Sequence, residues 1–403
     1  MRVKILKWSS ILLLIVLVAC GPKVNEEKID EATLQGNGSF AFDLFRELKQ
    51  EDQNVFISPY SISLVMSMTL AGAEGETESE IRRALYYEGM DDSTIIDTHQ
   101  NYSAYLSKDD QEVSIDLANS MWLDEEFQVK DEFESLMTDN LRAQLFQQKL
   151  SDPSIVEDMN GWVKGHTGGM IDQLIKEPYS KNTRLLLTNA IYFNGTWQYP
   201  FSENSTKEGT FHLVSGEEQQ LDLMHQQESF SYMETKDMKG VRLPYGEEGE
   251  EGNYSMYVML PIDQSLDTLI QKFDAEAFAE MKGQMIREPV TLTLPSFKLQ
   301  YGVKSLNDSL KSLGMEDVFS ETEADLSDMS DVHLFLSALN HKAVIDVTEK
   351  GTEAAAVTQA EFEKVSGFAE QPKEFRADRP FFYIIADEKY DSILFMGTYE
   401  GEL

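Results

Sequence analysis

The sequence predicts an α+β protein built as one large domain, and three observations support this. A chain of 403 residues with 41% hydrophobic residues can bury a large core. It contains alternating strand patterns as well as an apolar pattern at helical spacing. No segment rich in proline, glycine and serine divides it, and no solenoid or propeller repeat is present, so we prefer one domain to two.

The N-terminus has the pattern of a secretory signal. Cationic residues precede the apolar run Ile11–Val18, which is too short to span a bilayer. The next residues, Leu17–Cys20, resemble the bacterial lipoprotein box, in which the chain is cut before a cysteine that carries a diacylglycerol. Cys20 is the only cysteine, so it has no disulfide partner; a structural thiol is the alternative.

These features divide the chain into three parts. We expect a signal peptide over residues 1–19, a lipidated flexible tether over 20–36 and a single folded domain over 37–403. A lipid and a tether anchor a protein to a membrane without spanning it. The expected location is the cell envelope, on a surface-exposed outer membrane or the extracellular side.

The first strong helical signal follows Ser58. Serine is a favoured helix N-cap, and Pro59 then occupies the first helical position. Ile62, Val65 and Met66 continue the pattern at helical spacing. The sequence therefore predicts a helix that begins immediately after Ser58.

A buried strand is predicted over Leu185–Phe193, where apolar residues surround Asn189. An amide left without a partner in such a strand would cost about 1 to 3 kcal/mol. Asn189 must therefore find a hydrogen-bond partner inside the core.

Three further strands are predicted near the C-terminus, over His341–Thr348, Arg379–Ile385 and Ser392–Tyr399. Between the first two lies a polar segment of roughly thirty residues, and connections of that length inside a compact domain are uncommon and usually functional or disordered. Its first half, Glu349–Glu363, alternates like a strand. One face is small and weakly polar, and consists of Thr352, Ala354, Ala356, Thr358, Ala360 and Phe362.

Small side chains suit a strand that must enter between two existing neighbours, and Gly351 can supply a swivel just before it. Taken alone, the segment also fits an exposed acidic loop with an alanine run. The firm strands on both sides favour the first interpretation.

Several motifs together resemble the serpin family, from about Phe40 to the C-terminus. They occur in the family's order, at Asn54–Ser63, Thr188–Trp197, Ala324–Ser327, His341–Ala343, Glu349–Ala356, Arg379–Phe381 and Phe395–Gly397. The resemblance implies a serpin fold of about eight to nine helices around three β-sheets, with a large central sheet and an exposed reactive loop at about 349–378. It also implies a polar shutter beneath the opening of that sheet, at Ser58, Ser61, Asn189 and His341.

The same resemblance implies the other site residues. Trp197 and Glu349 match positions at the end of the sheet where insertion starts. The hinge of the loop is implied at Glu349, Gly351, Thr352, Glu353, Ala354, Ala355 and Ala356.

The implied activity is inhibition of serine endopeptidases, with papain-like cysteine endopeptidases as a second class, by covalent trapping and insertion of the cleaved loop. The family's spacing from Glu349 places the scissile bond at Val365–Ser366, which suits an elastase-like enzyme, whereas Lys364 suits a trypsin-like one. Counting back from Pro380 leads to Ala369 instead, because the loop is about four residues longer than the common pattern. We choose Lys364, Val365 and Ser366 as the scissile region.

Composition excludes other classes of function. The net charge of −37 disfavours nucleic acid as a partner, because phosphate contacts need cations. The six histidines are scattered without metal-ligand spacing, and no phosphate loop or nucleophile motif is present, so no metal, cofactor or enzyme activity is expected.

We expect a monomer. The alternatives are a non-inhibitory serpin that acts as a surface binding protein, and a two-lobed solute-binding lipoprotein.

Overall fold

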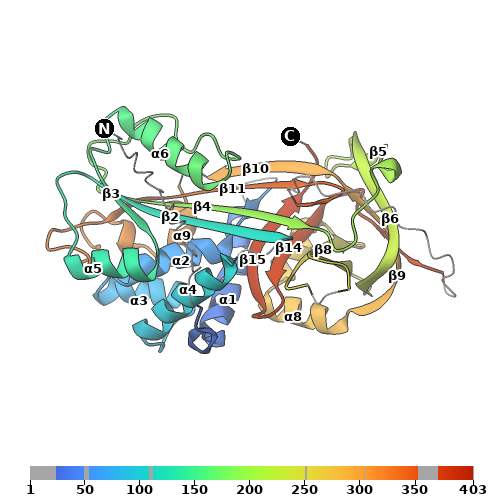
Figure 1. The fold of residues 1–403 in the computed structure, drawn as a ribbon, viewed down its shortest axis with the longest axis horizontal. Coiled ribbons are helices and arrows are strands. Elements are labelled where there is room, and N and C mark those ends of the chain that lie inside the picture. The colour runs from blue at the N-terminus through green and yellow to red at the C-terminus, as the bar shows by residue number, and fades with distance from the viewer. Residues whose placement is uncertain are drawn as a thin grey trace, which may run out of the picture.

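The computed structural model describes residues 24–49, 54–108, 112–249, 252–303, 305–352 and 371–402. These residues form nine α-helices and two hydrogen-bonded sheets (Figure 1). The helices are α1 (Glu31–Lys49), α2 (Pro59–Leu70), α3 (Gly75–Ala84), α4 (Asp92–Leu106), α5 (Asp131–Ser135), α6 (Ser154–His166), α7 (Leu266–Lys272), α8 (Ala275–Gln284) and α9 (Asn307–Ser312). The predicted α+β class is confirmed.

The central sheet has six strands. In order across the sheet they are β10 (Phe297–Val303), β11 (Leu336–Val347), β12 (Gly351–Thr352), β4 (Leu185–Thr196), β2 (Val113–Leu123) and β3 (Gln144–Gln147). Long parallel and antiparallel strands thus share one sheet. β11 also pairs directly with β4, in parallel, below the short strand β12.

The second sheet has nine strands. Along its main path these are β1 (Phe56–Ile57), β15 (Ser392–Tyr399), β14 (Phe381–Asp387), β8 (Tyr254–Pro261), β7 (Met238–Pro244), β6 (Glu218–Glu234), β9 (Ile286–Pro295) and β13 (Lys373–Arg376), and β5 (Lys207–His212) pairs with β6. The expected third sheet is not separate in the described part of the chain. The reason is that the long strand β6 pairs with β5, β7 and β9 and joins both groups of strands.

The central sheet is covered on both faces, as Figure 1 shows. On β4, Leu186 and Ala190 belong to a hydrophobic cluster with Ile155 and Met159 of α6. The alternate residues of β4, such as Ile191, belong to the main core with α2. Because successive strand residues point to opposite faces, one apolar strand contributes to both clusters.

The helix predicted after Ser58 is α2, which begins at Pro59. Ser58 Oγ accepts a hydrogen bond from the backbone N–H of Ser61 at 3.4 Å, so Ser58 is its N-cap. The predicted strands correspond to β4, β11, β14 and β15.

Two predicted boundaries change. The expectation of a flexible tether is wrong for residues 24–36, because a 3₁₀ turn at Glu26–Lys28 precedes α1, and both Ile29 and Leu34 are buried. The loop expected over 349–378 is shorter at both ends, because β12 and β13 belong to the two sheets. No helix in the described ranges is long and apolar enough to cross a membrane.

Candidate functional site

Four polar side chains lie together where α2 meets the central sheet: Ser58, Ser61, Asn189 and His341, which we call the shutter cluster. All four residues are fully buried. Ser61 Oγ donates to Asn189 Oδ1 at 2.6 Å, and His341 Nδ1 lies 2.9 Å from the same oxygen. The backbone N–H of Ser58 donates to His341 Nε2 at 3.3 Å. The four residues that the family resemblance implied therefore form one hydrogen-bonded unit.

These contacts determine the tautomer of His341. The backbone N–H of Ser58 can only donate, so Nε2 accepts; Asn189 Oδ1 can only accept, so Nδ1 carries the proton. Burial lowers the pKa of His341 to about 3. At neutral pH an uncharged ring thus connects α2, β4 and β11 without the cost of burying a charge.

The shutter cluster lies close to the point where two strands part. Asn189 of β4 and His341 of β11 are directly opposite each other, and direct pairing ends two residues further on, at Ile191 and Ala343. Beyond that point β12 pairs with both strands: Thr352 is opposite Val347 on β11 and Gly195 on β4. The sheet is therefore closed over the shutter cluster and occupied by the hinge above it.

The hinge turns sharply to enter the sheet. Thr348 N–H donates to Gly351 O at 2.8 Å, and Gly351 N–H donates back to Thr348 O at 3.3 Å. Glycine is required at 351 because a Cβ there would lie 2.0 Å from Gly195 O. Thr352 is only 1% exposed, so the small face predicted for this segment begins by pointing inward.

Trp197 secures the end of the sheet beside this turn. Its indole Nε1 donates to Thr348 O at 2.9 Å, and its backbone N–H donates to Lys350 O at 2.9 Å. Its ring stacks on Tyr245 with centroids 4.4 Å apart and an interplanar angle of 14°. Tyr245 in turn places its hydroxyl 2.7 Å from Thr352 Oγ1.

Glu349 is held by two contacts of its own. Its Oε1 accepts from Thr206 Oγ1 at 2.6 Å, and its carbonyl oxygen accepts from the backbone N–H of Phe201 at 2.8 Å. The neighbouring Lys350 lies 3.7 Å from Glu203, in an exposed ion pair of little energetic weight. Backbone and side-chain contacts thus fix the hinge from Glu349 to Thr352.

The remaining predicted site residues lie outside the described residues. These are Glu353, Ala354, Ala355 and Ala356 of the hinge, Lys364, Val365 and Ser366 of the scissile region, and Cys20. The chain is described again from Gln371, and β13 then pairs in parallel with β9, with Phe375 fully buried. Both flanks of the predicted reactive loop are therefore built into sheets.

Three residues of the site were not identified from the sequence: Asn119, Thr206 and Tyr245. Asn119 accepts from Asn189 Nδ2 at 2.6 Å and extends the shutter cluster to β2. The signal that could identify Asn119 is an amide within the strand pattern Val113–Leu123, because a buried amide there needs a partner for the same reason as Asn189. Nothing local distinguishes Thr206 or Tyr245 from other surface or core residues.

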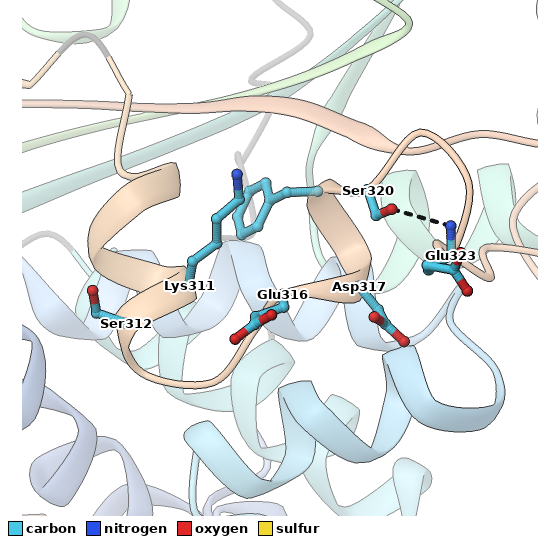
Figure 2. A pocket seen from close by; sticks show the side chains of 7 residues that line it. Lys311, Ser312, Glu316, Asp317, Ser320 and Glu323 are labelled. Atoms are coloured by element: carbon cyan, nitrogen blue, oxygen red, sulfur yellow. Dashed lines mark hydrogen bonds between the residues drawn. The ribbon is translucent and has the colours of Figure 1, made fainter.

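A surface hollow beside α9 is not part of this site. It has a volume of about 650 Å³ and is lined by Lys311, Ser312, Glu316, Asp317, Phe319, Ser320 and Glu323; Figure 2 shows Lys311, Glu316, Asp317 and Glu323 around it. The turn of the chain at Glu316 and Asp317 is held by α3: a side-chain oxygen of Glu80 accepts hydrogen bonds from the backbone N–H groups of both residues at 2.8 Å. These contacts have a structural role. No group of three or more potential metal ligands occurs in the parts of the chain that the structure describes.

Comparisons with known proteins agree with this arrangement. A sequence model of the family described as Serpin (serine protease inhibitor) matches residues 35–400. An uncharacterized serpin-like protein of Methanosarcina acetivorans is 33% identical over 378 residues, which cover 90% of this chain and 86% of that protein. A leukocyte elastase inhibitor of Bos taurus is 35% identical over 378 residues, covering 90% of this chain and 97% of the inhibitor. The native structure of the thermophilic serpin tengpin is similar with a TM-score of 0.86 and 30% identity, covering 94% of this chain and 96% of tengpin.

Proposed function

The chain belongs to the serpin family, and on that premise we propose that it inhibits serine endopeptidases as a suicide substrate. Serpins are generally protease inhibitors rather than enzymes. The observation that carries the proposal is the position of Thr352, which is already hydrogen-bonded as a strand between β11 and β4. A strand that starts there can extend only by separating these two neighbours.

The covalent step follows ordinary acyl transfer. The hydroxyl of the target's catalytic serine attacks the carbonyl carbon of the scissile residue, the peptide C–N bond breaks, and the new amino terminus leaves with the proton. The target then remains attached through an ester bond. Twelve inserted residues, from Thr352 onward, span about 40 Å at about 3.3 Å per residue, so insertion carries the attached enzyme that far.

The shutter cluster suits this movement. Insertion past Ala343 must break the direct pairing of β11 with β4, including the contact between His341 and Asn189. Each of these side chains keeps a partner on its own side: Asn189 retains Asn119, and His341 retains the backbone of Ser58. When β11 and β4 separate, neither side chain is therefore left without a hydrogen-bond partner. If His341 and Asn189 had only each other as partners, both would become unsatisfied.

The target class depends on the scissile region. We propose Lys364, Val365 and Ser366 for this region, with trypsin-like and elastase-like serine proteases as the first targets and papain-like cysteine proteases as the second. The relatives include leukocyte elastase inhibitors, which supports the elastase-like choice by analogy.

The test is incubation with a panel of trypsin-, elastase-, chymotrypsin- and papain-like proteases. Denaturing electrophoresis should show a complex that survives boiling in detergent, and mass spectrometry of the released C-terminal peptide should give the cleaved bond. Thr352→Arg places a long charged side chain at a fully buried hinge position. It should therefore turn the protein into a substrate that is cleaved without forming the complex.

Two results would contradict the proposal. One is a detergent-stable complex that Thr352→Arg forms as well as the parent chain does. The other is cleavage of the loop by every protease in the panel with no complex and no rise in melting temperature. That second result would favour the alternative, a non-inhibitory serpin that acts as a surface binding protein.

We also propose that the protein is a monomer anchored to the cell envelope by a lipid on Cys20. The signal-like N-terminus and the single cysteine support the lipid anchor. Cys20→Ser should abolish incorporation of a labelled fatty acid and move the protein from the membrane fraction to the soluble fraction. Unchanged fractionation of that variant would contradict lipidation.

A further inference from the structure

One side-chain contact links Thr352, the inserted residue of the hinge, to the body of the protein. Thr352 Oγ1 and Tyr245 OH lie 2.7 Å apart, and both residues are almost completely buried. Within the described part of the chain, each of these hydroxyls has the other as its sole hydrogen-bond partner. A buried hydroxyl without a partner is unfavourable, so each one favours the position of the other.

Tyr245 is itself held rigidly. It follows β7 directly and forms an isolated β-bridge with Trp197, while its backbone N–H donates to Tyr254 O at 3.0 Å. Its ring stacks on Trp197 and meets the ring of Phe193 edge-on, with centroids 4.9 Å apart. The hydroxyl that Thr352 contacts is therefore fixed in position, so the hydrogen bond breaks if Thr352 moves.

Two glycines make this contact possible. Gly195 lies opposite Thr352 on β4, and a Cβ at 195 would lie 2.8 Å from Cδ1 of Tyr245. A Cβ at Gly351 would lie 2.0 Å from the carbonyl oxygen of Gly195. The close approach of the hinge to β4, and of the tyrosine ring to β4, thus depends on the absence of both side chains.

We propose that Tyr245 is a positioning residue for loop insertion. Its hydroxyl keeps Thr352 in register between β4 and β11, so insertion after cleavage continues an existing strand instead of starting a new one. The effect on inhibition rests on the proposed function, whereas the effect on the hinge does not. A hydrogen bond of ordinary net strength corresponds to about a 2- to 12-fold change in the equilibrium between the inserted and released hinge.

The first experiment needs no protease. Amide hydrogen exchange is measured on peptides covering residues 348–352 in the parent, Tyr245→Phe, Thr352→Val and the double variant. Each single change should speed exchange about 2- to 12-fold, and the double change should add nothing further, because both remove the same bond. Exchange over residues 336–343, where β11 pairs with β4, should stay the same.

The matched control is Tyr232→Phe. Tyr232 is a buried tyrosine on β6 whose hydroxyl donates to Glu234 at 2.7 Å, away from the hinge. Removing the Tyr232 hydroxyl should leave amide hydrogen exchange over residues 348–352 unchanged. Parent-like exchange in Tyr245→Phe, or an equal increase in Tyr232→Phe, would overturn the assignment of the contact.

The second experiment measures how many inhibitor molecules are consumed for each protease molecule trapped. The excess of this ratio over one counts the inhibitor molecules cleaved without trapping. It should rise about 2- to 12-fold in Tyr245→Phe and stay constant in Tyr232→Phe, because slower insertion gives the target more time to deacylate. Faster hinge exchange with an unchanged ratio would overturn the positioning role. If the parent chain traps no protease, the proposed function fails, while the exchange experiment still decides whether Tyr245 holds the hinge.

Discussion

Asn189 and Asn119 face each other across β4 and β2, and Asn189 Nδ2 donates to Asn119 Oδ1 at 2.6 Å. Through this bond the shutter cluster spans β2, β4, β11 and the start of α2. Asn189 uses both ends of its amide: the oxygen accepts from Ser61 and His341, and the nitrogen donates to Asn119. The strand pair β2 and β4 is thus linked as one unit on the side that must move away from β11.

Loss of the Asn119 amide and loss of the Asn189 amide should both destabilise the native state, but by different amounts. Asn119→Ala removes one partner and should lower the free energy of the first unfolding transition in urea by about 1 to 3 kcal/mol. Asn189→Ala removes the partner of three groups and should cost more. Exposed Asn182→Ala is the control and should change this free energy by less than about 0.5 kcal/mol. Equal losses for Asn119→Ala and Asn182→Ala would show that the amide pair does not hold the strands together.

Two buried histidines should make the protein sensitive to acid. Burial lowers the pKa of both His99 and His341 to about 3, whereas a histidine in the unfolded chain titrates near 6.5. Below about pH 6.5 the unfolded state therefore binds protons that the native state does not. Each histidine should reduce the free energy of unfolding by about 1.4 kcal/mol per pH unit as the pH falls from about 6.5 toward 3.

Urea unfolding at several pH values between 7.5 and 4.5 measures this slope. His99→Gln should reduce the slope below pH 6 by about 1.4 kcal/mol per unit relative to the parent. His333→Gln is the control, because His333 is exposed. A slope that His99→Gln leaves unchanged would mean that His99 is already protonated in the native state.

Asp387 should change the pH dependence of stability in the opposite direction from the two histidines. Its carboxyl is buried, where Tyr102 donates to Oδ2 at 2.9 Å, and burial raises its pKa from 3.8 to about 6. The native state therefore holds this proton at pH values where the unfolded state has lost it. Its contribution to stability is fully present below about pH 3.8 and is lost as the pH rises through about 6.

Asp387→Asn removes this opposing contribution. Between about pH 6 and 3.8 the variant should lose stability on acidification about 1.4 kcal/mol per unit more steeply than the parent. The same urea series measures it, with the exposed Asp331→Asn as the control. Parallel slopes in the parent and Asp387→Asn would contradict the raised pKa.

Gly351→Ala should release the hinge from the sheet. The added Cβ would lie 2.0 Å from Gly195 O, which is a backbone atom that cannot move aside easily. Exchange over residues 348–352 should rise while the rest of the central sheet keeps its protection. Gly161→Ala is the matched control: it lies exposed in α6 with nothing within 4 Å, and should instead stabilise the protein by about 0.5 to 1 kcal/mol. Retained protection at 348–352 in Gly351→Ala would show that the strand tolerates a side chain there.

The sequence was sufficient wherever the information is local or periodic. Ser58 followed by Pro59 predicts the start of α2, alternation predicts β11, and the inward position of Thr352 agrees with the small face predicted for the hinge. The ordered motifs predict the serpin fold, which the comparisons confirm. These inferences succeed because caps and strand faces depend on residues a few positions apart.

Only the tertiary structure decided which distant side chains meet. Tyr245 and Thr352 are 107 positions apart, and Asn119 and Asn189 are 70 apart. Whether such pairs touch depends on strand register and on which strands share a sheet, and a shift of one residue would turn each side chain to the other face. The same reason explains why residues 24–36 belong to the folded domain: their polar composition suggested a tether, but Ile29 and Leu34 find apolar partners that only the folded chain brings near.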